Sequence, residues 1–181
     1  MIALSVAAAV VALAACGGGP STNNAGESSP TPTHSAAANL SVGDVCKLVT
    51  AGEASAAVGT TVANAAGSSQ IPGACFYTSS DGSSGVIIYA IAEADATAAQ
   101  SVDPSQIEAG FASMYGIKNA HEVNGIGDKA FEYTVTSTQS NQSGVAIFVF
   151  KANVLLFLIM TPSTDQSKLE GLARTAVSRL S

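Results

Sequence analysis

From about residue 40 onwards, short apolar segments alternate with turn-forming residues. Six or seven of these segments are rich in β-branched and aromatic residues, which is typical of strands. We predict strands at residues 60–64, 74–78, 85–91, 119–123, 129–136, 144–151 and 154–161. Because the links between several of them are tight, the sheet is expected to be largely antiparallel.

Helical spacing of apolar residues occurs before, between and after these strands. We predict helices at residues 45–49, 51–58, 104–115 and 165–180. The clearest start is a capping box formed by Thr50 and Glu53, and Gly59 ends that helix. This order of elements predicts an α+β fold in which about three helices lie mainly on one face of the sheet. It is also compatible with two degenerate α-β-β halves.

Two of the predicted strands are apolar at nearly every position, namely residues 145–150 and 154–160. A strand with one face in water would instead alternate apolar and polar residues. Either the chain covers both faces of the sheet at these strands, or a ligand or another protein covers one of them.

The N-terminal segment has the pattern of an export signal. Residues 2–12 form an apolar run that is shorter than the ~20 residues needed for a membrane-spanning helix. Residues 13–16 read Leu-Ala-Ala-Cys and resemble the lipobox of bacterial lipoproteins, in which the Cys is lipidated and becomes the first residue after cleavage. We therefore expect residues 1–15 to be removed and Cys16 to attach the protein to a membrane. The basic residue usual in a signal is missing, and a start codon placed too far downstream would explain this.

Residues 16–39 consist almost entirely of small and polar residues, with a Ser/Thr/Pro-rich centre. Such a segment cannot bury enough apolar surface to offset the entropy of ordering it. We expect a disordered tether here. Residues 40–181 are then long enough for one domain with a substantial core.

Charge restricts the class of partner. The chain has 13 acidic and 7 basic residues, a net charge of −6, and no basic cluster. Nucleic-acid-binding proteins concentrate positive charge, so we do not expect nucleic acid as a partner.

The three cysteines have two expected roles: one is lipidated, and the other two can pair with each other. With Cys16 lipidated, Cys46 and Cys75 remain as an even pair in an exported chain. Because export favours oxidised thiols, we expect a disulfide between them.

Motifs of known catalytic machinery are missing from the sequence: there is no G-x-S-x-G, P-loop, H-E-x-x-H or G-x-G-x-x-G pattern. His121, beside Glu122, is expected to be a structural strand residue. Residues 128–132 contain two carboxylates that we assign to a turn and to the solvent face of a strand. We therefore predict a protein that is not an enzyme and that uses no metal or cofactor.

The leading hypothesis for function is binding of a hydrophobic or amphipathic ligand, such as part of a lipid, between sheet and helices. The predicted helices are rich in alanine, and such helices either pack very closely or leave a space. The candidate lining residues are Ile107, Phe111, Met114, Phe148, Phe150, Phe157 and Ile159. A filled core would contain the same residues. The alternative hypothesis is a docking or sensor module that binds another protein of the cell envelope through the sheet.

One local motif is a pair of glycines, Gly125 and Gly127, around Ile126. It predicts a tight turn with Ile126 in the core, or alternatively a backbone nest for an anion. Together with the lipobox, the tether and the segments around Cys46 and Cys75, this motif resembles uncharacterised actinobacterial lipoproteins of the domain-of-unknown-function type. More distantly, the chain resembles the extracellular sensor domains of mycobacterial serine/threonine kinases. The resemblance implies a location on the outer face of the cell membrane, and it implies no activity.

Overall fold

A computed structural model of the chain describes residues 40–65, 72–112, 115–138 and 140–181. The predictions for the signal peptide, for Cys16, for the tether and for Met114 concern residues outside these ranges.

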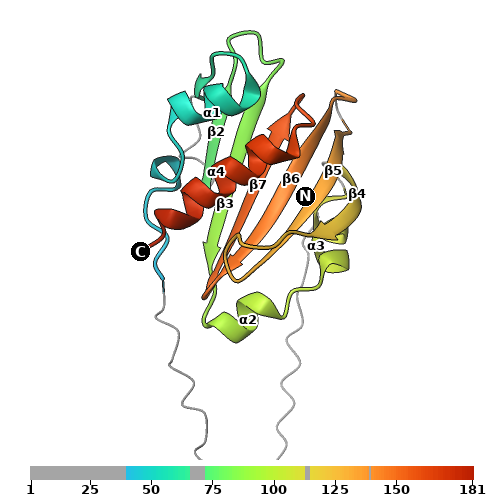
Figure 1. The fold of residues 1–181 in the computed structure, drawn as a ribbon. Helices are drawn as coiled ribbons and strands as arrows, with labels where there is room; N and C mark the ends of the chain where they lie inside the picture. The colour runs from blue at the N-terminus through green and yellow to red at the C-terminus, as the bar shows by residue number, and fades with distance from the viewer. Residues whose placement is uncertain (1–39, 66–71, 113–114, 139) are drawn as a thin grey trace, which may run out of the picture. The chain divides into compact units, whose positions relative to one another are not determined.

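The described residues form an α+β fold, as predicted (Figure 1). The helical elements are a 3₁₀ turn η1 (Val45–Lys47), α1 (Ala51–Val58), α2 (Ala96–Gln100), α3 (Pro104–Phe111) and α4 (Gln166–Ser178). The strands are β1 (Ala63–Asn64), β2 (Ala74–Thr78), β3 (Gly85–Ala92), β4 (Tyr115–Glu122), β5 (Lys129–Ser137), β6 (Ser143–Lys151) and β7 (Val154–Thr161).

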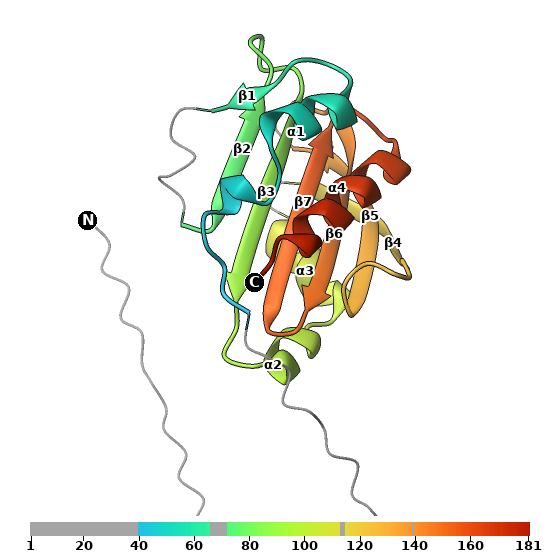
Figure 2. The same cartoon turned by 60° about the vertical axis from the view of Figure 1, so that its left-hand side comes forward.

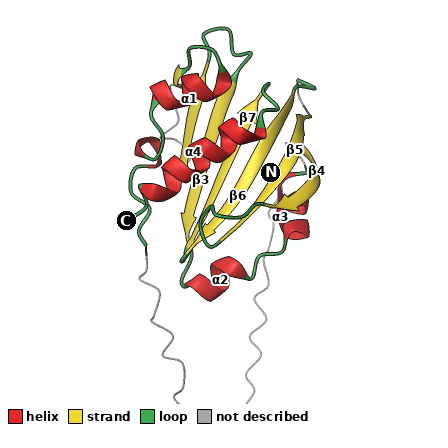
Figure 3. Cartoon of the chain, viewed as in Figure 1, coloured by secondary structure: helices red, strands yellow, loops and turns green. Residues whose placement is uncertain are grey.

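All seven strands belong to one sheet in the order β1-β2-β3-β7-β6-β5-β4, and every neighbouring pair is antiparallel (Figure 3). The last strand in the chain, β7, therefore lies in the middle of the sheet, between β3 and β6. This order brings the first and second halves of the folded chain together along the β3–β7 pair.

The sheet has two apolar faces, and the helices divide between them. On the first, which we call the α4 face, Ile88, Ile147 and Leu158 pack with α1, α4 and η1. On the second, the α3 face, Phe148 and Phe157 pack with side chains from α2 and α3. Figures 1 and 2 show α4 crossing one side of the sheet and α3 on the other. The prediction of helices mainly on one face therefore holds for α1 and α4 but not for α2 and α3.

Coverage of both faces explains why β6 is apolar throughout. Successive side chains of a strand point to opposite faces, so Ile147 packs under α4 while Phe148 packs on the α3 side. The sequence left two explanations open: coverage of both faces by the chain itself, or coverage of one face by a ligand or another protein. At β6 the first is correct, because the chain's own helices cover both faces.

The boundary between α3 and β4 differs from the one predicted from the helical spacing of apolar residues. The helix was predicted to continue to residue 115, but α3 ends at Phe111 and β4 begins at Tyr115. The start of β4 is determined by strand pairing, because Tyr115 and Ile117 lie opposite Ser137 and Val135 of β5. Long-range pairing of this kind overrides helical spacing.

The predicted disulfide is present between Cys46 of η1 and Cys75 of β2, with their Cα atoms 5.2 Å apart. Beside it, the buried Tyr77 hydroxyl lies 2.9 Å from the carbonyl oxygen of Cys46 and also lies within hydrogen-bond distance of the Val49 carbonyl oxygen. The N-terminal turn of the domain is thus held to the sheet by a covalent bond and by a buried hydroxyl.

The Gly-Ile-Gly motif forms a turn with Ile126 in the core, where its side chain is 2% exposed. Gly125 and Gly127 have φ of 77° and 62°, in the left-handed region that glycine adopts without strain. A Cβ at Gly127 would also lie 2.5 Å from the Phe150 carbonyl oxygen. These features match the turn interpretation of the motif.

Candidate functional site

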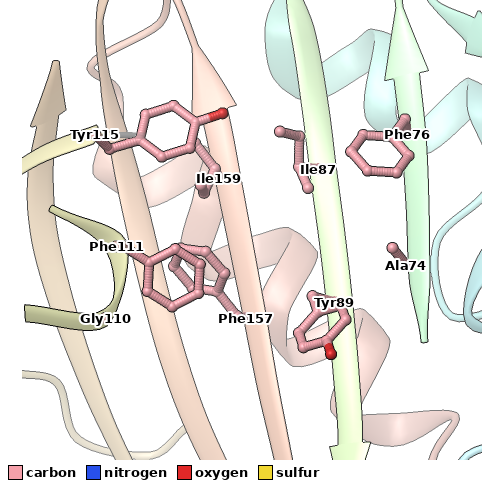
Figure 4. A pocket seen from close by; sticks show the side chains of 9 residues that line it. All are labelled: Ala74, Phe76, Ile87, Tyr89, Gly110, Phe111, Tyr115, Phe157 and Ile159. Carbon is pink, nitrogen blue, oxygen red and sulfur yellow. The ribbon is translucent and has the colours of Figure 1, made fainter. Parts of the chain in front are cut away.

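The candidate site is a hollow on the α3 face of the sheet, over β2, β3 and β7. Among the described helices, α2 and α3 pack against β4, β6 and β7, whereas β2 and β3 contact η1 and α1 on the opposite face. The uncovered part of the α3 face contains a cavity of about 470 Å³, which we call the apolar groove. Its lining residues are Ala74, Phe76, Ile87, Tyr89, Gly110, Phe111, Tyr115, Phe157 and Ile159 (Figure 4).

The floor of the groove follows from strand register. The lining residues of β2, β3 and β7 lie directly opposite one another and form two rows across the strands. One row is Ala74, Tyr89 and Phe157, and the other is Phe76, Ile87 and Ile159. Because neighbouring strands are about 4.8 Å apart, each row spans about 10 Å. The floor is therefore a narrow apolar surface that crosses three strands.

One side of the groove is closed by aromatic side chains from three elements. The Phe111 ring of α3 lies over Phe157, with their centroids 4.6 Å apart. Phe148 stacks on the same Phe157 ring at 3.9 Å. Next to Phe111, Gly110 lines the groove without a side chain. In Figure 4, Tyr115 of β4 reaches toward Ile159 and extends this wall.

The lining is nearly devoid of polar groups. The two side-chain oxygen atoms in it belong to Tyr89 and Tyr115, and none of the nine lining residues is charged. Burial raises the pKa of the Tyr115 phenol, so this group is a neutral hydroxyl at physiological pH. The groove can therefore bury apolar surface and offer a hydroxyl, but it offers no ionic contact.

The structure brings together some of the residues named from the sequence and separates others. Phe111, Phe157 and Ile159 line the groove, and Phe148 lies beside Phe157 on the neighbouring strand, in ring contact with Phe111 and Phe157. Phe150 is fully buried away from the groove, edge-on to Phe131. The Ile107 side chain and all of Met114 lie outside the described structure.

Sequence reasoning missed the half of the groove contributed by β2 and β3. Phe76, Ile87 and Tyr89 are half-buried and contribute to the floor. The sequence contained one signal for this floor: large apolar residues occupy successive positions of β2 and β3, and successive residues point to opposite faces. Because Tyr77 and Ile88 point to the α4 face, their neighbours in the strand point to the α3 face. Pattern alone does not show that β7 pairs with β3 and so completes the groove.

On the opposite face of the sheet, the α4 face, His121 of β4 lies against Glu132 of β5. The sequence interpretation placed Glu132 at the solvent face, and this is wrong because its side chain is 1% exposed. Its Oε2 lies 3.1 Å from His121 Nε2, while its Oε1 finds no hydrogen-bond partner among the described residues. Burial raises the pKa of the Glu132 carboxyl, and the nearby Glu170 carboxylate raises it further.

A break in strand register aims His121 at this carboxylate. The pairing of β4 with β5 shifts between Lys118 and His121, and Asn119 in that interval has φ of 58°. Such bulges redirect side chains on the bulged strand. The result is a single His–Glu contact, and in the described part of the chain no group of three or more His, Cys, Asp and Glu residues is arranged to hold a metal ion.

Helices in the described ranges are all too short or too polar to cross a lipid bilayer. No protein-family model matches the chain, and no curated protein gives a significant match to it.

Proposed function

We propose that this protein is a membrane-anchored extracytoplasmic lipoprotein that binds a hydrophobic or amphipathic ligand in the apolar groove. The observation that carries the proposal is an uncharged cavity of about 470 Å³ over the part of the sheet that the described helices leave uncovered. Ligand pockets are usually clefts of roughly 300–1,000 Å³ with apolar linings and a few polar groups. The groove has these properties.

The Cys46–Cys75 disulfide fits an extracytoplasmic location, because such bonds persist in oxidising compartments. The resemblance of residues 13–16 to a lipobox adds the membrane anchor. On this proposal Cys16 carries the lipid, and the protein works at the outer face of the cell membrane.

The start of the folded region is well placed for a tethered domain. Leu40 donates its backbone N–H to Asn153 Oδ1 at 2.7 Å, and Asn153 donates back to the Leu40 carbonyl oxygen at 3.1 Å. A flexible chain the length of residues 16–39 has a root-mean-square extension of roughly 25–30 Å. On this proposal, such a tether would keep Leu40 within roughly 25–30 Å of the membrane surface, where apolar ligands are concentrated.

Native mass spectrometry tests this function. The variant Cys16→Ser, recovered without detergent from cells that normally make the protein, should carry a reproducible added mass. Extraction with organic solvent should remove that mass and recover an apolar molecule in the solvent phase. A clean ligand-free mass would contradict the proposal.

The rival function, docking of another envelope protein, is favoured by a different observation. Phe76, Ile87 and Tyr89 are only half-buried, and exposed apolar patches mark interaction surfaces. This function predicts a ligand-free mass together with a protein partner crosslinked in cells to residues of the groove.

A further inference from the structure

We infer that the occupant of the apolar groove is one flexible hydrocarbon chain of a membrane lipid, and that Gly110, at the rim of the groove, leaves its entrance open. This inference rests on the proposed function and specifies the class of ligand.

Charge is the first argument. Among the described lining residues, the two polar side-chain atoms are tyrosine hydroxyls, and none of these residues carries a charge. An ionised group placed in this groove would lose its hydration without gaining an ionic partner, which is strongly unfavourable. A headgroup must therefore remain in solvent or at the membrane surface, and only the apolar portion of a lipid enters.

Shape is the second argument, and it favours a flexible chain over a planar ring system. Phe157, on the β7 part of the floor, is already in ring contact with Phe148 at 3.9 Å and with Phe111 at 4.6 Å. Phe157 is also only 2% exposed, so little of its ring is available for a flat ligand to stack on. The floor also varies from the small Ala74 to the large Phe76 on the same strand. A chain that can bend at each carbon follows such a floor, whereas a rigid polycycle does not.

The lipid on Cys16 is a poor candidate for this chain. A single buried acyl chain gives only marginal membrane attachment, and firm attachment requires two signals. Withdrawing a chain of the anchor into the groove would weaken the attachment. The occupant is therefore expected to come from another lipid of the membrane.

Gly110 of α3 lies at the solvent-exposed rim of the groove. A Cβ built at Gly110 meets no heavy atom within 4 Å, so open space lies beside it. A leucine there would not clash with the protein, and its side chain would add bulk at the exposed rim of the groove. Leucine is also a better helix former than glycine, so the substitution is compatible with α3.

The chain also offers a matched control. Gly171 in α4 has no heavy atom within 4 Å of a built Cβ either, and α4 packs on the opposite face of the sheet. The variants Gly110→Leu and Gly171→Leu therefore make the same chemical change in two helices, only one of which borders the groove.

The experiment measures binding of the fluorescent fatty acid cis-parinaric acid to the full chain carrying Cys16→Ser. We expect saturable binding that palmitate displaces and that the planar hydrocarbon pyrene does not. Adding Gly110→Leu should weaken this binding about tenfold or more, equivalent to at least ~1.4 kcal/mol. Adding Gly171→Leu should leave it unchanged, and urea unfolding should show that both variants are folded.

Each other outcome overturns a defined part of the inference. Stronger binding of pyrene than of fatty acid would refute the ligand class while leaving the proposed function intact, provided that native mass spectrometry still finds a bound apolar molecule. Equal effects of the two leucine substitutions would refute the role of Gly110. Loss of cis-parinaric acid sites in the lipidated wild type, relative to Cys16→Ser, would show that the occupant is the protein's own anchor.

Discussion

His121 Nε2 lies 3.1 Å from Glu132 Oε2 and links a half-exposed imidazole on an edge strand to a carboxylate that is 1% exposed. The other charged groups that act on this carboxylate come from α4, where Glu170 accepts a hydrogen bond from Arg174 at 2.9 Å. Burial and Glu170 raise the pKa of Glu132, and His121 and Arg174 oppose that rise. The stability of the folded protein therefore depends on pH through Glu132.

We predict that Glu132→Gln changes the pH dependence of stability. Because the pKa of Glu132 is higher in the folded protein than its ordinary value of 4.5, the folded state binds this proton more tightly than the unfolded state does. The contribution of Glu132 to the free energy of unfolding is thus most favourable below pH 4.5 and decreases as pH rises through the folded-state pKa. The variant lacks this decrease, so its stability relative to the wild type should rise with pH.

Urea unfolding between pH 4 and pH 8 measures this difference. Glu122→Gln, which alters an exposed residue of the neighbouring strand, should show the wild-type profile. Parallel profiles for the wild type and Glu132→Gln would show that Glu132 does not titrate differently in the folded protein.

A pair of tyrosine substitutions tests how much buried hydroxyl groups contribute to the free energy of unfolding. The Tyr133 hydroxyl is buried on the α3 face and has no hydrogen-bond partner among the residues described. Burial raises its pKa to about 12, so it is neutral. Removing an unpartnered buried polar group is stabilising, and Tyr133→Phe should raise the free energy of unfolding by about 1 kcal/mol.

Tyr77→Phe is the matched comparison, because the Tyr77 hydroxyl can donate to the Cys46 or Val49 carbonyl oxygen. Its loss should cost about 1–2 kcal/mol, since these buried carbonyl oxygens then lose a donor. Chemical denaturation of both variants gives the two values. A larger loss for Tyr133→Phe than for Tyr77→Phe would mean that Tyr133 has a partner outside the described residues.

The disulfide should contribute substantially to stability. The bonded cysteines are 29 residues apart, and closing a loop of that length is worth about 3–4 kcal/mol in the chain-entropy model. Cys46→Ala and Cys75→Ala should each lower the free energy of unfolding by this order of magnitude. The double variant should be no less stable than either single variant, because all three lack the same bond. Two reactive thiols in the native oxidised protein would rule the crosslink out.

Anchoring at Cys16 gives a prediction in cells. Cys16→Ser, expressed behind a complete signal sequence, should leave the membrane fraction and either appear in the medium or remain unprocessed. The physical reason is that two or more buried acyl chains supply firm attachment, at about 0.8 kcal/mol for each buried CH₂. Cell fractionation and the mass of the mature N-terminus test this. Unchanged fractionation and processing of the variant would disprove lipidation at this residue.

Local chemistry in the sequence was sufficient for several elements. The Thr50–Glu53 capping box is present in the structure, with the Glu53 side chain accepting from the Thr50 N–H at 2.8 Å, and Gly59 ends the helix with φ of 85°. These features depend on residues three to nine positions apart in the sequence, so they can be predicted from local sequence alone. The disulfide could be predicted for another reason, because only one pairing was open to Cys46 and Cys75 once Cys16 was set aside.

Only the tertiary structure decided which face each helix covers, where the groove lies and which carboxylate is buried. Glu132 lies in a strand whose sequence suits either face, and it is buried because α4 crosses that face and a bulge brings His121 opposite. The groove exists because β7 inserts between β3 and β6, which sets Phe157 opposite Tyr89 and Ile159 opposite Ile87. That pairing joins residues about seventy positions apart. Periodicity assigns a side chain to a face of its own strand, but it contains no information about which strand will lie beside it.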